Sequence, residues 1–311
     1  MSQSGNQEPN AIPLYNRSLD GFPVSLVNTL EFCRYRWRFR TKDAVRFPPG
    51  TSGNLIRGAF GLLLREIAPP AVYRQIFEPG RGSETAPSGL VDWPRPFLFR
   101  TEGLDGVTVP PQGSFHIDMH WFDVRSPFAE LFHDVFRQFA QRGLGPGRGR
   151  AELVAMELLD LEDRPAAGPS VIALDPPARP TDTVRVRFVT PTELKAGGEL
   201  VRQPDFAILF ARLRDRVSTL RALYGVGPLA IDFRALGERA AAVRMVASSV
   251  AWERVERKSS RTGQVHWQGG FTGEAEYAGE LGEFVPWLEA ARWTGVGRQT
   301  VWGKGDVRVV T

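Results

Sequence analysis

Cysteine is nearly absent from this sequence: Cys33 is the only one among 311 residues. A disulfide framework and a cysteine-based zinc site are therefore both excluded. No apolar run approaches the roughly 18 residues that a membrane-spanning helix needs. The polar first ten residues are not typical of a signal peptide either. We therefore expect a soluble protein of the reducing cytoplasm.

Lysine is also scarce. Only Lys42, Lys195, Lys258 and Lys304 are lysines among 39 basic residues, and the other 35 are arginine. The planar guanidinium of arginine binds phosphate through two parallel hydrogen bonds and stacks on bases. A GC-rich genome produces the same bias at every position, so composition alone leaves nucleic-acid binding and codon usage open. The positions of the arginines in the sequence are needed to distinguish these two explanations.

The length favours two domains. Segments 79–96 and 164–183 are rich in proline, have no hydrophobic period, and are typical of connections. We therefore predict an N-terminal domain over 1–165 with an insertion around 79–112, a linker over 166–183, and a C-terminal domain over 184–311.

Both halves show a similar order of expected elements: strand, helix, strands, helix, glycine-rich turn, strand. The first half gives strand 30–40, a helix from Ser52, strand 115–122, a helix capped by Ser126 with Pro127 at its first turn, and strand 151–159. The second half gives strand 184–189, helix 205–224, long strands 242–257 and 264–277, helix 283–292 and strand 306–310. This order is typical of the ferredoxin-like fold, so we predict an α+β protein of two tandem β-α-β-β-α-β domains.

Two predicted strands alternate in character. Between Arg34 and Arg40, arginines alternate with aromatic residues, and we expect Phe32, Trp37 and Phe39 to face helices. In strand 115–122, Phe115, Ile117, Met119 and Trp121 share one face, which leaves His116, Asp118 and His120 on the other. The arginine strand is one candidate contact for RNA, since arginine and aromatic side chains stack on bases and bind the backbone.

The glycine-rich turn 295–305 matches no nucleotide-binding fingerprint. Thr300 occupies the third glycine position of the dinucleotide motif, and Arg298 and Gly305 break the P-loop pattern. Two interpretations remain. The glycines either expose backbone amides beside Arg298, Gln299 and Lys304 to an anion, or they only allow a tight crossing from helix to strand.

The C-terminal residues resemble a known family. Gly269-Gly270-Phe271-Thr272-Gly273, then Gly279, Leu281, Phe284, Pro286 and Leu288, and finally the Gly-x-Gly-x5-Gly-x-Gly loop are similar to the CRISPR-associated endoribonucleases that process precursor crRNA. These enzymes belong to the repeat-associated mysterious protein (RAMP) superfamily. Weaker matches are the first-helix stretch 57–61 with Ser52, and the turn 260–264. The resemblance is dense only over 254–310.

The resemblance implies tandem ferredoxin-like domains that bind a CRISPR repeat RNA along a basic groove. It implies cleavage without a metal or cofactor: the ribose 2′-OH attacks the adjacent phosphate and leaves a 2′,3′-cyclic phosphate and a 5′-OH. The alternative is a non-catalytic RAMP subunit that binds crRNA and scaffolds an effector complex with other CRISPR subunits. No membrane partner is expected.

Under this resemblance, the candidate RNA-binding residues lie in the last loop and in a polar turn. They are Gly295, Gly297, Arg298, Gln299, Thr300, Gly303, Lys304 and Gly305, with Lys258 and Arg261 from the turn between the two long strands.

The general base is harder to assign. Family members often carry a histidine on or just after the first helix, but the stretch 52–67 contains none. His266 follows the polar turn, while His116 and His120 flank Asp118, whose carboxylate is able to orient an imidazole. His133 lies among polar helix residues and is expected to be solvated. A site without histidine, which uses only arginine or lysine, remains open.

Overall fold

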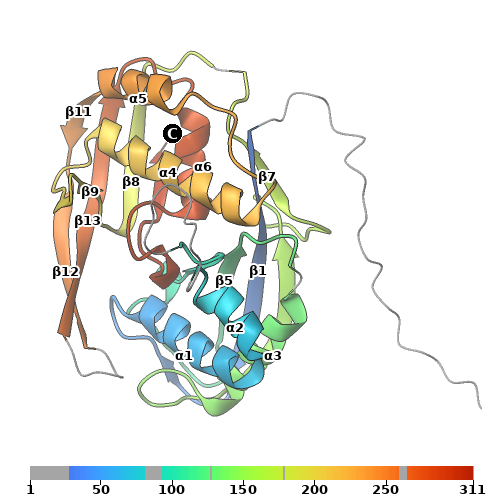
Figure 1. Ribbon diagram of the computed structural model, residues 1–311. Coiled ribbons are helices and arrows are strands. Elements are labelled where there is room, and N and C mark those ends of the chain that lie inside the picture. Colours follow the sequence, from blue (N-terminus) through green and yellow to red (C-terminus); the bar gives the residue numbers. More distant parts are fainter. Residues whose placement is uncertain (1–27, 81–92, 127, 178, 259–264, 311) are drawn as a thin grey trace, which may run out of the picture.

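The computed structural model describes residues 28–80, 93–126, 128–177, 179–258 and 265–310, with backbone alone at 102, 254–258 and 265–268. Two domains lie one above the other, and each is an antiparallel sheet with helices packed on one face (Figure 1).

The N-terminal sheet has the strand order β3-β5-β1-β6, and β7 pairs with the beginning of β1. Its strands are β1 (Thr29–Thr41), β3 (Phe97–Arg100), β5 (Ser114–Trp121), β6 (Ala151–Leu159) and β7 (Ser170–Ala173). Its helices are α1 (Ser52–Ile67), α2 (Pro70–Phe77) and α3 (Ala129–Arg142), and a small ladder joins β2 (Val45–Arg46) to β4 (Thr108–Val109).

The C-terminal sheet has the order β11-β13-β8-β14, with β12 also paired to β13. Its strands are β8 (Thr183–Thr192), β11 (Arg244–Ser248), β12 (Ala251–Lys258), β13 (Val265–Ala278) and β14 (Val307–Val310). Helices α4 (Phe206–Tyr224), α5 (Phe233–Ala242) and α6 (Val285–Thr294) pack with it, and β9 (Lys195–Ala196) pairs with β10 (Glu199–Leu200). In both sheets the last strand lies beside the first, and the first beside the third, as the ferredoxin-like fold requires. The predicted fold class is confirmed.

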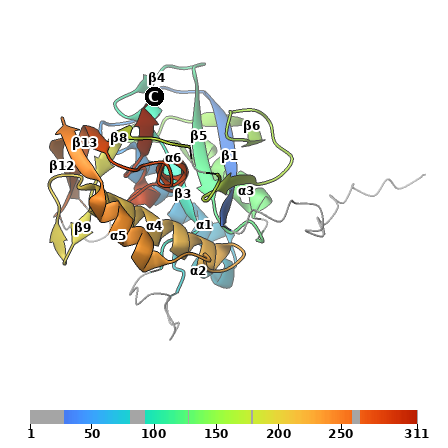
Figure 2. The ribbon, with the colours of Figure 1, turned by 90° about the horizontal axis from the view of Figure 1, so that it is seen from above.

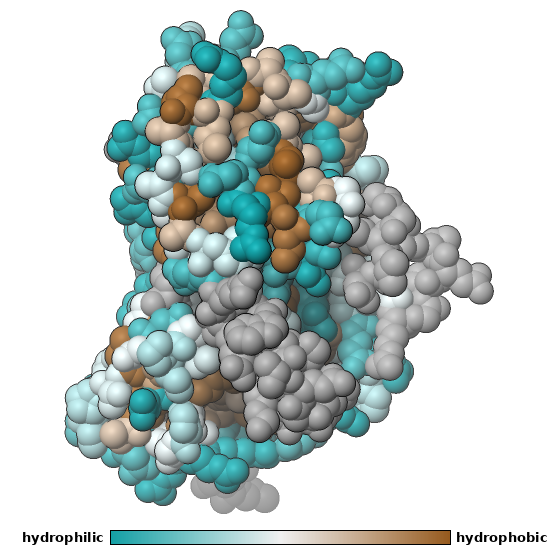
Figure 3. Space-filling model, turned by 90° about the vertical axis from the view of Figure 1, so that its left-hand side faces the viewer, coloured by the Kyte–Doolittle hydropathy of each residue, from teal (hydrophilic) through white to brown (hydrophobic). Residues whose placement is uncertain are grey.

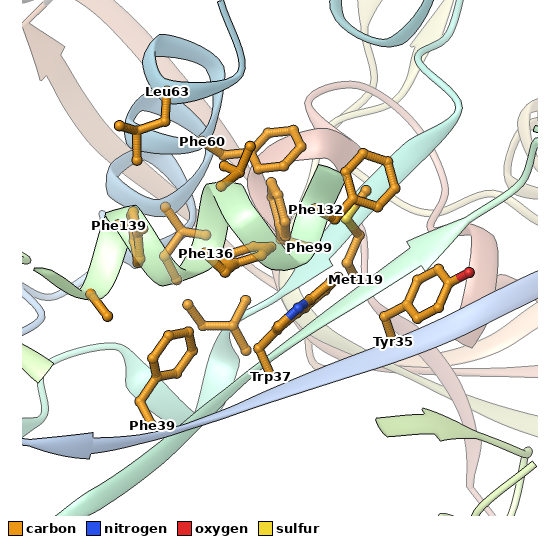
Figure 4. Close-up of a cluster of buried hydrophobic side chains, with 14 of the residues drawn as sticks. Tyr35, Trp37, Phe39, Phe60, Leu63, Phe99, Met119, Phe132, Phe136 and Phe139 are labelled. Carbon is orange, nitrogen blue, oxygen red and sulfur yellow. The ribbon is translucent and has the colours of Figure 1, made fainter. Parts of the chain in front are cut away.

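Alternation along β1 builds the N-terminal core. Trp37 and Phe39 point toward the helices, and Trp37 stacks on Phe136 of α3 with ring centroids 4.3 Å apart (Figure 4). The predicted inner face of β5, from Phe115 to Trp121, is buried in the same cluster. Because side chains alternate across a sheet, the arginines of β1 lie on the opposite face.

Phe32 faces helices as expected, but not those of its own domain. It lies on the same side of β1 as the arginines and packs against α4 and α6, with its ring centroid 5.6 Å from that of Trp293. Phe32, Leu98, Phe122, Leu220, Tyr224 and Trp293 form a third buried cluster, which joins the two domains.

Helix α6 ends between the two sheets (Figure 2), and its last carbonyls accept hydrogen bonds from three directions. Arg100 of β3 donates to the carbonyl of Arg292, and His120 Nδ1 lies 2.7 Å from the carbonyl of Trp293. Arg216 Nε of α4 donates to the carbonyl of Thr294 at 2.6 Å. Carbonyls at a helix end have no partner within the helix. Here the N-terminal domain and α4 supply the donors, so the junction is polar as well as hydrophobic.

Several element boundaries differ from the sequence predictions. Helix α3 begins at Ala129 after Phe128, so Ser126 is not its N-cap; the Ser126 hydroxyl instead donates to Asp123. The predicted strand 242–257 is two strands, with residues 249 and 250 between β11 and β12. Helix α5 was not predicted, although Asp232 caps it by accepting from the amides of residues 234 and 235. Strand β3 falls inside the predicted insertion and β7 inside the predicted linker.

On the face seen in Figure 3, hydrophobic residues form small separate patches among hydrophilic ones. The large exposed apolar side chains are distributed over different elements, among them Leu62 of α1, Val154 of β6, Phe233 of α5 and Val246 of β11. None of the helices in the described ranges has the length and apolar character needed to cross a bilayer.

Candidate functional site

The glycine-rich loop 295–305 connects α6 to β14 and packs against both domains. Gly53 of α1 lies against it so closely that a Cβ there would be 1.9 Å from the carbonyl oxygen of Trp302. Gly297 and Gly305 both have positive φ, and a Cβ on either would meet a backbone carbonyl within 2.3 Å. These glycines are required by close packing and by left-handed backbone.

The loop does not present a row of free amides. The amides of Gly295, Val296, Arg298, Gly303 and Gly305 donate to protein carbonyls, Arg298 to Glu193 and Gly305 to Pro191. The hypothesis that these amides face an anion is therefore wrong at those positions, because each amide already donates a hydrogen bond to a carbonyl of the protein. The alternative, a tight crossing between helix and strand, describes these glycines better.

The predicted loop residues separate into an inner and an outer group. Thr300 and Lys304 are buried, and burial lowers the pKa of the Lys304 ammonium, against the opposing effect of Asp105 and Glu253. Lys304 therefore does not reach a ligand directly. Arg298 is exposed and pairs with Glu193 at 2.6 Å, and Gln299 has left-handed backbone with φ 66°.

The outer group lines a cavity of about 640 Å³, which we call the glycine-loop pocket. Its cations are Arg95, Lys195, Arg212, Arg216 and Arg298, its carboxylates are Glu193 and Asp215, and Trp93 and Trp302 contribute aromatic surface. Burial and the nearby charge of Arg100 lower the pKa of Arg216 to about 9. An excess of cations beside exposed aromatic surface suits a nucleotide, since phosphate and base each find a partner.

A second cavity, of about 470 Å³, lies on the outward face of the N-terminal sheet. Register places Arg34 opposite His120, Arg36 opposite Asp118 and Arg38 opposite His116. Arg34, Arg36 and Arg100 from the sheet line it together with Arg292 of α6 and Arg308 of β14. We call this the arginine pocket.

Asp118 lies at the arginine pocket and binds two of its arginines. It accepts from Arg36 Nε at 2.6 Å and from Arg34 at 2.8 Å, and Arg34 also bonds Asp163 at 2.7 Å. Burial alone would raise the pKa of Asp118, but the hydrogen bonds and charges of Arg36 and Arg34 outweigh it and lower the pKa. The carboxylate is therefore ionised at neutral pH and fixes the two guanidinium groups.

Arg100 and Arg292 have no carboxylate partner among the described residues, in contrast to Arg34, Arg36 and Arg308. Arg100 Nη1 is buried without a hydrogen-bond partner. Burial lowers the pKa of Arg292 and the charges of Arg308 and Arg34 add to this effect, while Asp306 and Asp163 oppose it. Arg100 in turn helps to lower the pKa of the buried Asp306, so the carboxylates near these two arginines act on them without a direct ion pair.

The predicted histidines are in different environments. His116 is half exposed at the arginine pocket, with Nε2 4.0 Å from Asp118, and burial lowers its pKa below the usual 6.5. His120 is buried between Phe32 and Trp293, and burial lowers its pKa to about 3. Since a carbonyl only accepts, Nδ1 of His120 carries the proton that bonds Trp293. His120 is thus held in the domain junction and is not available to a substrate.

The polar turn is only partly described. His266 lies in β13 opposite Arg257, and Lys258 is the last residue of β12, but their side chains and the whole of Arg261 lie outside the described residues. His133 is half-buried on α3. Within the described ranges, no three His, Cys, Asp or Glu side chains gather as a metal site requires.

Sequence patterns did not point to Arg100, Arg292 or Arg308. These residues come from a short strand, a helix end and the last strand, and only the fold brings them to the arginine face of β1. The alternation over Arg34–Arg40 was the local signal for that face. Arg95, Lys195 and Arg212 at the glycine-loop pocket had no such signal.

Two known family models match different parts of this chain. Residues 186–307 match the family model of the CRISPR-associated endoribonuclease Cas6. The C-terminal domain is therefore similar to the Cas6 endoribonucleases. Residues 30–173 match a second family model, AF_1859_N, described only as an N-terminal domain. The two matches correspond to the two ferredoxin-like domains.

Solved Cas6 structures share the whole fold. The Cas6 (TTHB231) product complex, whose protein is from Thermus thermophilus, has a TM-score of 0.58 at 20% identity and covers 90% of this chain and 100% of its own. The Cas6 (TTHA0078) product complex has a TM-score of 0.51 at 19% identity, with 91% and 100% covered. A partial Cas6-RT-Cas1–Cas2 complex has a TM-score of 0.55 at 10% identity, with 90% of this chain and 46% of that chain covered. A search of curated proteins finds no match.

Proposed function

We propose that this protein binds CRISPR repeat RNA and cleaves precursor crRNA within the repeat. The observation that carries the proposal is the rim of the glycine-loop pocket, where the loop of the domain that matches Cas6 presents Arg298 and Gln299 beside Lys195, Arg212 and Arg95. This cluster suits the phosphodiester backbone, with Trp93 and Trp302 available to bases. Lys258 and Arg261 of the polar turn extend the proposed contact.

The proposed reaction is transesterification by the RNA itself. A general base removes the proton of the 2′-OH, O2′ bonds to the adjacent phosphorus, and the bond from phosphorus to O5′ breaks. The departing O5′ takes a proton, so the products are a 2′,3′-cyclic phosphate and a 5′-OH. Cations near the phosphate stabilise the charge that develops on its oxygens. No step requires a metal ion.

Two histidines are proposed for the base. His116 is partly exposed and has a lowered pKa, so it is neutral at pH 7 and able to accept a proton. His266 lies next to the polar turn on β13. His120 is withdrawn from this role because it is buried and its Nδ1 bonds Trp293.

The first test is cleavage of an end-labelled repeat RNA by the full chain in EDTA. We expect one cut, with a 2′,3′-cyclic phosphate on the upstream product and a 5′-OH on the downstream one. Loss of cutting on chelation would contradict the metal-independent mechanism. Tight RNA binding without any cut would identify the alternative, a crRNA-binding RAMP subunit that joins other CRISPR effector proteins.

The base is tested by His116→Ala and His266→Ala, with His133→Ala on α3 as the matched control. Loss of a general base slows a reaction by about 10²- to 10⁴-fold. We expect one of the two variants to lose that much while the control keeps its rate. Full rates in all three would exclude histidine catalysis and leave positioning by arginine and lysine.

A further inference from the structure

The glycine-rich loop begins directly after the last turn of α6, whose final carbonyls are held by side chains from other elements. The carbonyl of Thr294 is the last one before the loop, and it accepts a hydrogen bond from Nε of Arg216 at 2.6 Å. Arg216 lies on α4, in the same domain as the loop. The carbonyls of the two preceding residues bond side chains of the N-terminal sheet instead. The bond from Arg216 is therefore the contact through which α4 holds the start of the loop.

The path of the loop after Thr294 depends on such hydrogen bonds. Gly295 has left-handed backbone with φ 66°. Glycine restricts its own backbone less than any other residue, so it does not by itself fix the direction in which the chain leaves the helix. The base of the loop closes where the amide of Val296 donates to the carbonyl of Gly305 at 2.9 Å. Because a carbonyl at a helix end has no partner within the helix, the donor from α4 helps to define this base.

The residues proposed to bind RNA follow shortly after this point. The amide of Arg298 donates to the carbonyl of Glu193, and its guanidinium pairs with the Glu193 carboxylate at 2.6 Å. Glu193 thus holds the outer part of the loop, and Arg216 holds its start. A misplacement of about 1 Å is able to slow a reaction by about 10²-fold. The position of Thr294 therefore matters for the geometry of the proposed cleavage.

The surroundings of Arg216 do not explain it as a stabilising residue. Its Nη2 is buried without a hydrogen-bond partner, although the residue lines the glycine-loop pocket. Among the described residues no carboxylate pairs with it, and the neighbouring Asp215 pairs with Arg212 and Arg214. Burial of a guanidinium without a counter-ion lowers stability. A residue that departs from this rule is expected at a functional site, and placing the loop is a function that its one bond to Thr294 serves.

We propose that Arg216 is a positioning residue, which fixes the start of the glycine-rich loop by donating from Nε to the carbonyl of Thr294. The inference rests on the proposed function for the reaction that the loop serves. The hydrogen bond, and not the positive charge, is what the loop requires from Arg216. Arg212, which lies one turn earlier on α4, differs in that it is proposed to face the RNA backbone directly.

Two substitutions of equal length separate the bond from the charge. Arg216→Gln removes the charge, but its amide nitrogen lies as many bonds from Cα as Nε does, so it is able to donate to Thr294. Arg216→Met has the same length and no donor. Arg214→Met is the matched control, because Arg214 lies on the same helix and donates to a different main-chain carbonyl, that of Phe233, at 2.7 Å. Thermal unfolding checks each variant, and Arg216→Leu, which also lacks a donor, replaces Arg216→Met if that variant does not fold.

The first measurement needs no RNA and is therefore independent of the proposed function. Hydrogen exchange over residues 293–305, followed by mass spectrometry, reports how readily the loop opens. We expect exchange to become about 5-fold faster in Arg216→Met, the size expected for the loss of one hydrogen bond. Arg216→Gln and Arg214→Met should exchange like wild type. Unchanged exchange in Arg216→Met, or equal acceleration in Arg216→Gln, would overturn the proposal.

The second measurement is cleavage of the end-labelled repeat RNA in a single turnover at saturating protein, with the dissociation constant determined in parallel. We expect Arg216→Met to cut at least about 10-fold more slowly, while its affinity changes by less than about 3-fold, because misplacement acts on the reacting geometry more than on the sum of contacts. Arg216→Gln and Arg214→Met should cut at the wild-type rate.

The remaining outcomes separate this inference from the proposed function. Equal losses in Arg216→Gln and Arg216→Met would mean that the charge contacts RNA directly, and would overturn the positioning role. Full rates in both variants would overturn it as well. A wild-type protein that does not cut would contradict the proposed function alone, and hydrogen exchange would still decide whether Arg216 fixes the loop.

Discussion

The two ferredoxin-like domains share a topology but use the outward faces of their sheets differently. On the C-terminal sheet, Arg185 and Arg187 of β8 are opposite Glu276 and Glu274 of β13, and each arginine bonds its neighbour. On the N-terminal sheet, Asp118 is shared by Arg34 and Arg36. On the C-terminal face each arginine therefore has its own carboxylate, whereas on the N-terminal face two arginines share one buried carboxylate.

The two faces also differ in how deeply their ion pairs are buried. The C-terminal pairs are more than half exposed on the arginine side, where ion pairs contribute little to stability. The pair of Arg34 and Asp118 has side chains only 6% and 7% exposed. Removing one member of a buried pair leaves an uncompensated charge, which is costly. The comparison leads to predictions that differ in size between the faces.

The largest expected effect is that of Asp118→Ala. Arg34 and Arg36 would lose their shared acceptor in a buried place, so we expect the free energy of unfolding to fall by about 3 to 5 kcal/mol. Glu274→Ala on the other sheet should cost less than about 1 kcal/mol. Urea denaturation of both variants measures the difference, and equal losses would remove the distinction between the faces.

The second prediction is that the free energy of unfolding depends on pH because of His120, which lies in the domain junction. His120 has a pKa of about 3 in the folded protein and about 6.5 when unfolded, so the unfolded state takes up a proton first as the pH falls. Stability is complete above pH 6.5 and decreases below it, by about 2 kcal/mol at pH 5. His120→Phe should flatten this slope in denaturation measured from pH 7.5 to 5. A slope unchanged by the substitution would show that other groups cause it.

The third prediction, of similar size, compares lysine with arginine on the two faces. Arg36→Lys keeps the charge but loses the two-pronged contact with Asp118, at an expected cost of about 1.5 to 3 kcal/mol. Arg187→Lys on the balanced face should change stability by less than about 0.5 kcal/mol. Thermal unfolding distinguishes the two, and a harmless Arg36→Lys would mean that Asp118 needs only a nearby charge.

The fold was predictable from the sequence because its signals are local and repeated. The alternation in β1 and β5 and the helical spacing of α4 determine which side of each element is buried, and the order of elements then selects the topology. Helix α5 was missed although Asp232 is a suitable cap, since only Leu236 and Ala240 of its residues are buried and they make a short apolar stripe. That Phe32 faces helices was predictable, but that these helices belong to the other domain was not, because the pattern along one strand does not say what packs on each of its faces.

The site was less predictable because it is assembled from distant segments. Arg34 and Arg36 belong to a visible pattern, but Arg100, Arg292 and Arg308 become neighbours only through domain packing. The glycine loop was recognisable as a motif, yet whether its amides face inward or outward depends on acceptors such as Glu193 and Pro191, which are about a hundred residues away. No local rule contains that information.

The end of α6 has a consequence for how the chain can be divided. A gene cut at the proline-rich connection would separate the carbonyls of residues 292 and 293 from Arg100 and His120, and would expose Phe32, Leu98 and Phe122 to water. Each half would then carry an exposed apolar surface, which favours aggregation, and hydrogen-bonding groups without partners. Split reporters or domain-swapped chimeras of this protein would therefore need to carry α6 on both halves or rebuild that contact surface.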